Sequence, residues 1–253
     1  AKTGLSKISP RILARILGPK IEGAACGRPD KGGGRPSAAR PLCGSILGPK
    51  ILAKIRGLIL LNPVLARCSA DPLKHNPFAP ARLELPQAEG VAEAAFEADH
   101  RSSLAKIYYA LCGDAARNGD LWPAIGVNEP VLDHMTLPAP FPAWMSEAEL
   151  DRFAAIFRQS GFRGAFNRYR NIDRDYHDLP NYGVDRITQP STFIAGTLDL
   201  VRSMVPGRDA YEFADELLVD MRGMTLIEGA GHWIQQERPQ EVTSALLAFL
   251  KGL

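Results

Sequence analysis

The sequence predicts an α/β protein in which a mainly helical segment interrupts the strands. A short apolar run at residues 58–61, closed by Asn62 and Pro63, is typical of a strand buried on both faces of a parallel sheet. Helical periodicity dominates the middle of the chain, and two more strand segments and a closing helix come last. This order of strand, helical insertion, strand, helix, strand and helix indicates an α/β core with a helical cap.

The middle and C-terminal elements each carry their own signals. Helical spacing across residues 91–112 places apolar side chains at Val91, Ala95, Leu104, Ile107, Tyr108 and Leu111. Ser146 and Glu149 form a capping box that opens another helix, whose shared apolar face comprises Leu150, Phe153, Ile156 and Phe157. Residues 192–195 and 224–227 are predicted strands. Pro239 is expected to start a closing helix with the apolar residues Val242, Leu246, Phe249 and Leu250.

The first 57 residues differ in composition from the rest of the chain. They hold 12 Lys and Arg residues against two acidic residues, whereas the remaining 196 residues hold 18 basic and 26 acidic residues. All 19 aromatic residues lie at Phe78 or later, and the first 57 residues contain no Val. Because strands favour aromatic residues and Val, we expect this basic segment to build β-sheet poorly and to be partly disordered.

The composition disfavours several classes of protein. The cysteines form neither a disulfide framework nor a metal-binding pattern, so free thiols in a reducing, cytoplasmic compartment are expected; they are Cys26, Cys43, Cys68 and Cys112. The longest apolar run is far shorter than the about 20 residues that a membrane-spanning helix needs. The basic segment lacks aromatic residues for base stacking, which disfavours nucleic-acid binding, and it lacks the serine richness of a transit peptide.

Two residues that could do chemistry follow two of the predicted strands. Asp199 comes after the strand at 192–195, and His232 comes after the strand at 224–227. Loops that follow neighbouring parallel strands open on the same edge of the sheet, so these side chains can meet there. A carboxylate that accepts from one imidazole nitrogen fixes the tautomer and leaves the other nitrogen free to take a proton. Each residue alone could equally serve only to cap its loop.

Longer stretches around these two residues resemble the acid and histidine loops of the α/β-hydrolase superfamily. They are residues 193–199, with the sequence FIAGTLD, and residues 228–239, with the sequence EGAGHWIQQERP. The Trp that follows the His, and the Pro that begins the last helix, most resemble epoxide hydrolases. Residues 90–93 (GVAE) and 160–171 (SGFRGAFNRYRN) resemble the cap domain of that family, so the resemblance runs from about Gly57 to the C-terminus.

The resemblance implies an α/β-hydrolase fold with a helical cap. Residues 58–66 and 188–253 would form the core and residues 67–187 the mainly helical cap, with residues 1–57 as an atypical basic segment. The implied partner is a small epoxide or a related apolar electrophile, with no nucleic acid and no membrane span. The implied reaction needs no metal and no organic cofactor.

The resemblance also implies a role for three residues. In this family an aspartate attacks an epoxide carbon, and the ester intermediate is then hydrolysed to a vicinal diol. His232 would be the base that activates water for that hydrolysis, and Asp199 would be the acid that orients it. Tyr169 would be a cap tyrosine that donates a hydrogen bond to the epoxide oxygen.

The family's second cap tyrosine has no counterpart in the sequence. It is expected shortly before the GVAE segment, where residues 81–87 of this chain are ARLELPQ. Tyr108 and Tyr109 lie later, on the predicted cap helix, and we expect them to be packing residues. The second proton donor therefore stays unassigned.

The nucleophile is also not recognisable. The family places it on a tight strand-to-helix turn, with small residues two positions before and after it, roughly twenty residues ahead of the strand at residue 58. Ser37 has Arg35 where a small residue is needed, and Asp30, Cys26 and Cys43 fail in the same way. No His-Gly-x-Pro segment supplies an oxyanion hole. No segment of the sequence is thus recognisable as the N-terminal side of the hydrolase fold, as in a truncated or rearranged gene, a misread N-terminal exon or frame, or an engineered chain.

Three functional hypotheses follow from these observations. The first is an epoxide hydrolase impaired by the missing nucleophile, and the second is a catalytically inactive, truncated relative or binding module. The third is a haloalkane or haloacetate dehalogenase, or an esterase, of the same superfamily. Because a base without a nucleophile cannot complete the two-step reaction, we expect the chain alone to show little or no epoxide turnover.

Overall fold

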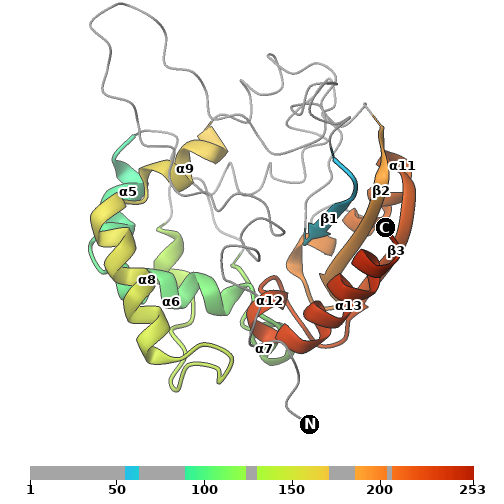
Figure 1. Cartoon of the computed structure of the whole chain (residues 1–253). Coiled ribbons are helices and arrows are strands. Elements are labelled where there is room, and N and C mark those ends of the chain that lie inside the picture. The colour runs from blue at the N-terminus through green and yellow to red at the C-terminus, as the bar shows by residue number, and fades with distance from the viewer. Residues whose placement is uncertain (1–54, 63–88, 124–129, 171–185, 204–206) are drawn as a thin grey trace, which may run out of the picture. The chain divides into compact units, whose positions relative to one another are not determined.

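A computed structural model of the chain describes residues 55–62, 89–123, 130–170, 186–203 and 207–253 (Figure 1). All of them belong to the unit Ala39–Leu253. The expectations for the basic N-terminal segment fall almost wholly outside the described residues. The segment 81–87 also lies outside the described residues. So do the four residues weighed as nucleophile candidates, Cys26, Asp30, Ser37 and Cys43.

Three parallel strands form the sheet, in the order β1-β2-β3. The predicted strand at 58–61 is confirmed as β1 (Leu58–Leu61). The other two predictions covered only the C-terminal parts of β2 (Ile187–Gly196) and β3 (Leu218–Ile227). Polar residues and Pro190 break the apolar pattern in the first half of β2. Pro190 lies before the stretch of β2 that pairs with β1, where the lack of an N–H donor does the least harm.

Alternate residues of the strands pack on opposite faces of the sheet. Leu60 and Phe193 lie on the face that packs with α11 (Phe213–Leu217), and Ile59 lies on the face that packs with α13 (Pro239–Lys251). Figure 1 shows these two helices on the two sides of the sheet. Apolar packing on both faces is what the continuous apolar run of β1 predicted.

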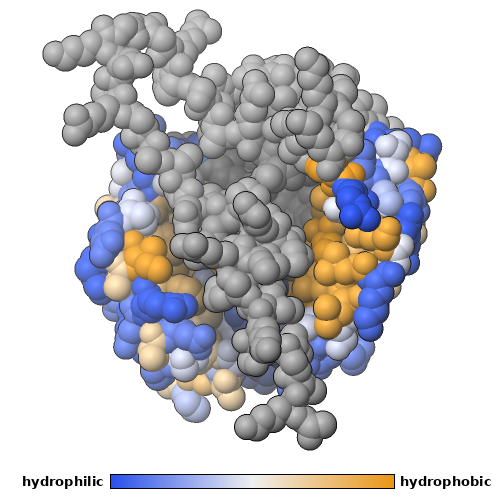
Figure 2. Space-filling view, in the orientation of Figure 1, coloured by the Kyte–Doolittle hydropathy of each residue, from blue (hydrophilic) through white to orange (hydrophobic). Residues whose placement is uncertain are grey.

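One edge of β1 pairs with β2, and no strand among the described residues pairs with its other edge. All four residues of β1 are half-buried. Figure 2 shows hydrophobic residues gathered on the surface over β1 and the adjoining sheet. Among the described parts of the chain, this edge is therefore the apolar margin of the sheet.

The predicted helical insertion lies between β1 and β2. Its helices are α5 (Val91–Glu97), α6 (His100–Ala110), α7 (Gly113–Asn118), α8 (Glu147–Ser160) and α9 (Arg163–Arg170), with a 3-10 turn at Val131–His134. All of them except α7 contribute to or adjoin one apolar cluster, whose large buried members include Phe96, Leu104, Leu150, Phe162 and Phe166. Ala115 of α7 packs in a smaller cluster with Tyr109 and Cys112. The insertion therefore has a core of its own.

The prediction of continuous helical periodicity across residues 91–112 was wrong at one point. The first helix ends at Glu97, and α6 begins after Asp99. Asp99 has an extended backbone, and its side chain caps α6 by accepting from the Ser102 N–H. The apolar positions named for this segment are not the ones that α5 buries. Val91 and Ala95 are exposed there, whereas Phe96 is buried.

The capping box and the proline start are both present. The Ser146 hydroxyl accepts from the Glu149 N–H, and the Glu149 carboxylate accepts from the Ser146 N–H, so α8 begins as predicted. Leu150 is buried on the predicted face of α8, but Ile156 is exposed at its margin. Pro239 occupies the first turn of α13. None of the described helices is both long enough and apolar enough to cross a bilayer.

Candidate functional site

Asp199 and His232 lie together at the carboxyl edge of the sheet. Asp199 follows the end of β2 at Gly196, and His232 follows the end of β3 at Ile227. Nδ1 of His232 lies 3.1 Å from Oδ2 and 3.2 Å from Oδ1 of Asp199. The structure thus brings together the two residues that the order of parallel strands predicted would meet.

Hydrogen bonds between the two loops set this distance. The N–H of Thr197 donates to the Ile227 carbonyl at 3.0 Å, and the N–H of Leu198 donates to the Ala230 carbonyl at 2.9 Å. The Thr197 hydroxyl accepts from the N–H of Gly229 at 2.9 Å. These bonds therefore join the residues that precede Asp199 to the residues that precede His232.

The carboxylate of the pair is buried, and the imidazole is partly exposed. The Asp199 side chain is 0% exposed and that of His232 is 27% exposed. Asp199 also accepts from the Val201 N–H at 3.0 Å and from the Tyr211 hydroxyl. Burial and the neighbouring Asp199 charge raise the pKa of Tyr211, so its hydroxyl stays protonated and donates. The buried carboxylate is thus held by three donors, and its imidazole partner reaches the surface.

A second carboxylate holds the backbone on both sides of His232. Glu237, in α12 (Ile234–Glu237), accepts from the N–H groups of Gly231 at 3.0 Å and Trp233 at 3.1 Å. The same carboxylate accepts from the Gly113 N–H of α7 at 2.9 Å. One buried side chain therefore joins the histidine loop to a helix 124 positions earlier in the chain.

The end of β1 also contacts the histidine loop. Asn62 directly follows β1 and adopts the left-handed φ of 46°, which Asn tolerates better than most residues. Its N–H donates to the Ile194 carbonyl at 3.0 Å, and its side-chain amide donates to the carbonyl of His232. From the sequence, Asn62 was predicted only to end the strand in a turn.

Helix α6 supports the histidine loop from the cap side. The N–H of His232 donates to the Leu111 carbonyl at 2.8 Å, and the Trp233 indole donates to the Tyr108 carbonyl at 2.9 Å. The Tyr108 ring lies 4.7 Å from the Trp233 ring, while the Tyr109 hydroxyl donates to Asp120 at 2.9 Å. The two tyrosines occupy packed positions, as expected for them.

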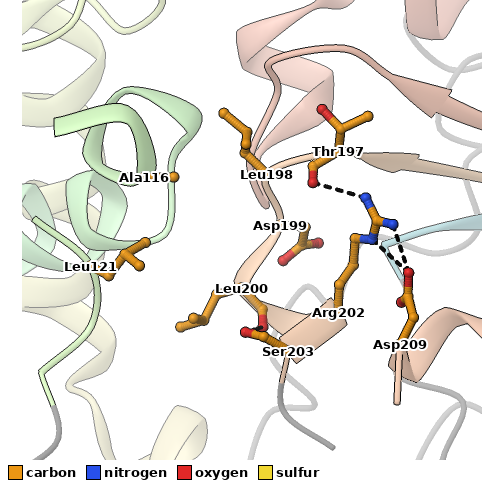
Figure 3. Close-up of a pocket in the computed structure, with 9 residues that line it drawn as sticks. All are labelled: Ala116, Leu121, Thr197, Leu198, Asp199, Leu200, Arg202, Ser203 and Asp209. Carbon is orange, nitrogen blue, oxygen red and sulfur yellow. Dashed lines mark hydrogen bonds and ion pairs between the residues drawn. The ribbon is translucent and has the colours of Figure 1, made fainter. Parts of the chain in front are cut away.

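A cavity of about 430 Å³ adjoins the acid loop (Figure 3). Its lining consists of Ala116, Leu121, Thr197, Leu198, Asp199, Leu200, Arg202, Ser203 and Asp209. The Arg202 guanidinium donates to the Thr197 carbonyl at 2.9 Å and pairs with Asp209 at 2.6 Å. One wall is therefore apolar, while the other carries an ion pair that braces the acid loop.

The chain has relatives among curated proteins and solved structures. It matches no protein-family model. Epoxide hydrolase A of Mycobacterium tuberculosis is 37% identical over 171 residues, which cover 66% of this chain and 51% of that protein. Epoxide hydrolase B of the same organism is 41% identical over 140 residues, which cover 55% of this chain and 38% of that protein. The chain thus spans about half the length, or less, of these curated relatives.

The solved structures agree with the sequence relatives. An epoxide hydrolase from an endophytic Streptomyces is 36% identical, with a TM-score of 0.66, and the match covers 78% of this chain and 60% of that one. The C-terminal part of this chain is thus similar in sequence and in fold to epoxide hydrolases, which are α/β hydrolases. The resemblance of its acid, histidine and cap segments to epoxide hydrolases is therefore confirmed.

The two helical segments that resemble the cap of epoxide hydrolases contact each other through an ion pair. Arg170, at the end of α9, donates to both carboxylate oxygens of Glu93 in α5, at 2.5 and 2.8 Å. The two side chains are only 12% and 10% exposed. Hydrogen bonds and the charge of Arg170 lower the pKa of Glu93 from 4.5 to about 2. Tyr169 lies on α9 directly before Arg170, so this pair fixes the helix that carries it.

Replacing Glu93 with Gln is expected to lower the free energy of unfolding by about 2 kcal/mol at pH 7, because it breaks a nearly buried ion pair. The pair contributes fully above pH 4.5, the ordinary carboxyl pKa, and its contribution is lost as the pH falls toward 2. Urea unfolding at pH 7, 4 and 3 checks this. Glu89→Gln is the control, because the Glu89 pair with Arg163 is exposed. A Glu93→Gln effect that persists unchanged at pH 3 contradicts the prediction.

No described residue hydrogen-bonds Nε2 of His232, the ring nitrogen that faces away from Asp199. Cys112 lies near the histidine loop, but burial raises the pKa of its thiol to about 11, so it is not a thiolate at neutral pH. Within the described ranges, no group of three or more His, Cys, Asp or Glu side chains is arranged to hold a metal ion.

Sequence reasoning missed three residues that hold the site. Glu237 belongs to the quoted histidine segment, and its place five residues after His232 was an available signal. Asn62 follows a strand end, as Asp199 and His232 do. Tyr211 carried no local signal, because it follows Asp199 by 12 residues.

Proposed function

We propose that the chain carries the water-activating part of an epoxide hydrolase, with residues 58–66 and 188–253 as core and 67–187 as cap. His232 is the base, and Asp199 orients it and stabilises the imidazolium that forms. The observation that carries this proposal is the Nδ1 contact of 3.1 Å with a fully buried carboxylate. Nε2 is the nitrogen left for water.

The cap supplies the proposed proton donor. Tyr169 donates to the oxygen of the opening epoxide, and its helix α9 is held by the ion pair between Arg170 and Glu93. The substrate class is a small epoxide, which is converted to a vicinal diol by way of an ester intermediate. The names of the curated relatives favour an epoxide over a haloalkane or an ester as substrate.

We further propose that this polypeptide by itself is impaired. The ester intermediate requires a nucleophile, and none of the described side chains hydrogen-bonds Nε2 of His232. This observation favours the second candidate function, a catalytically inactive relative that binds small apolar molecules. In that case the protein keeps the pair of Asp199 and His232 but does not hydrolyse epoxides.

Hydrolysis of a simple aryl epoxide by the chain and by His232→Ala tests the proposal. The expected result is diol formation at or near the uncatalysed rate for both proteins, because the two-step reaction needs a nucleophile and none of the described residues is in hydrogen-bond contact with Nε2 of His232. Robust turnover that is lost in His232→Ala would overturn the proposal that the chain by itself is impaired. Trapping the covalent intermediate would then identify the nucleophile.

A further inference from the structure

The Tyr211 side chain is held from three directions against the candidate acid. Its residue lies in the 3-10 turn Ala210–Glu212, and its hydroxyl donates to Oδ2 of Asp199. Its N–H donates to Asp209 at 3.0 Å. Its ring packs edge-on against Phe193 of β2, with the ring centroids 4.9 Å apart. Tyr211 is 3% exposed, so the hydroxyl is fixed in a buried site.

We propose that Tyr211 is a positioning residue that acts on His232 through Asp199. The Tyr211 hydroxyl and Nδ1 of His232 approach the same oxygen, Oδ2 of Asp199. The hydroxyl therefore fixes the rotation of the carboxylate and takes a share of its negative charge. That share sets how strongly Asp199 attracts the Nδ1 proton of His232.

The other charges around the pair leave this arrangement in place. Arg202 is engaged by Asp209 and by the Thr197 carbonyl, and Glu237 is engaged by backbone N–H groups. Tyr211 is held protonated by burial and by the Asp199 charge, which raise its pKa. Tyr211 is thus the neutral donor that shares Oδ2 of Asp199 with the imidazole.

This inference deepens the proposed function, because it rests on Asp199 and His232 as an acid and base pair. The test does not use turnover. A chain that shows no hydrolysis can therefore still confirm or refute the role of Tyr211, and the two proposals fail separately.

The test reads the ¹⁵N chemical shifts of the His232 ring through its carbon-bound protons, in the full chain. His232→Gln identifies the resonances among the five histidines. Tyr211→Phe removes the competing donor, so the Nδ1 resonance is expected to move downfield as its hydrogen bond to Asp199 strengthens. Tyr109→Phe is the matched control, since it removes a buried tyrosine hydroxyl that donates to another carboxylate, Asp120, at 2.9 Å.

An Nδ1 resonance that stays in place in folded Tyr211→Phe overturns the proposal, as does an equal movement in Tyr109→Phe. Site-specific 3-fluorotyrosine at position 211 keeps the ring and provides a second, opposite perturbation. The fluorinated phenol is the stronger donor, so the resonance is expected to move upfield. If Tyr211→Phe does not fold, an unchanged resonance in the fluorotyrosine protein overturns the proposal by itself.

Discussion

Replacing Gly196 with Ala is expected to lower the free energy of unfolding by about 3 kcal/mol or more. Gly196 is the last residue of β2, where the acid loop begins. A Cβ at this position would overlap the carbonyl oxygens of Ala230 and Gly231 in the histidine loop. Those atoms are backbone, so the collision cannot be relieved by moving a flexible side chain.

Gly223→Ala is the matched control for Gly196→Ala. Gly223 lies in β3, where the nearest atom to an added Cβ is the Thr192 hydroxyl oxygen at 4.0 Å. We expect that change to alter the free energy of unfolding by about 0.5 kcal/mol or less. Urea unfolding of the two variants beside the unaltered chain checks the pair. Equal stabilities would show that the two loops do not approach as closely as described.

Replacing Glu237 with Gln is expected to cost about 2–4 kcal/mol of unfolding free energy. The carboxylate accepts from the N–H groups of Gly113, Gly231 and Trp233, whereas the amide of Gln has one oxygen and turns an NH₂ group toward the remaining donors. Buried N–H groups without acceptors are expensive because water cannot reach them. The variant is also expected to loosen the backbone on both sides of His232.

Glu228→Gln provides the control for Glu237→Gln. Glu228 directly follows β3, is exposed and undergoes the same loss of charge. Thermal or urea unfolding should therefore separate the two variants clearly, with Glu228→Gln close to the unaltered chain. If the two variants are equally stable, Glu237 does not hold the loop.

The acid and base pair could be predicted from sequence because its geometry follows from topology. Asp199 and His232 each follow a strand, and neighbouring parallel strands place such residues on one edge. The carboxylate of Glu237 could not be assigned in the same way. Its partner Gly113 is 124 positions away, and no local pattern records a hydrogen bond across that separation.

The helices show where periodicity is informative and where it fails. The capping box at Ser146 and the proline at 239 are local signals, and both mark helix starts in the structure. The break at Asp99 was missed, because apolar spacing alone does not show where a side chain will cap a new helix. Val91, one of the apolar positions of that spacing, is 53% exposed.

A hybrid protein tests the central claim, that Asp199 and His232 form the water-activating pair of an epoxide hydrolase. The part of Mycobacterium tuberculosis epoxide hydrolase A that precedes its match to this chain is placed ahead of Leu58, and aryl epoxide hydrolysis is measured with and without His232→Ala and Asp199→Asn. The account predicts turnover in the hybrid that His232→Ala abolishes and Asp199→Asn strongly reduces. Turnover that survives both changes in a folded hybrid would contradict it.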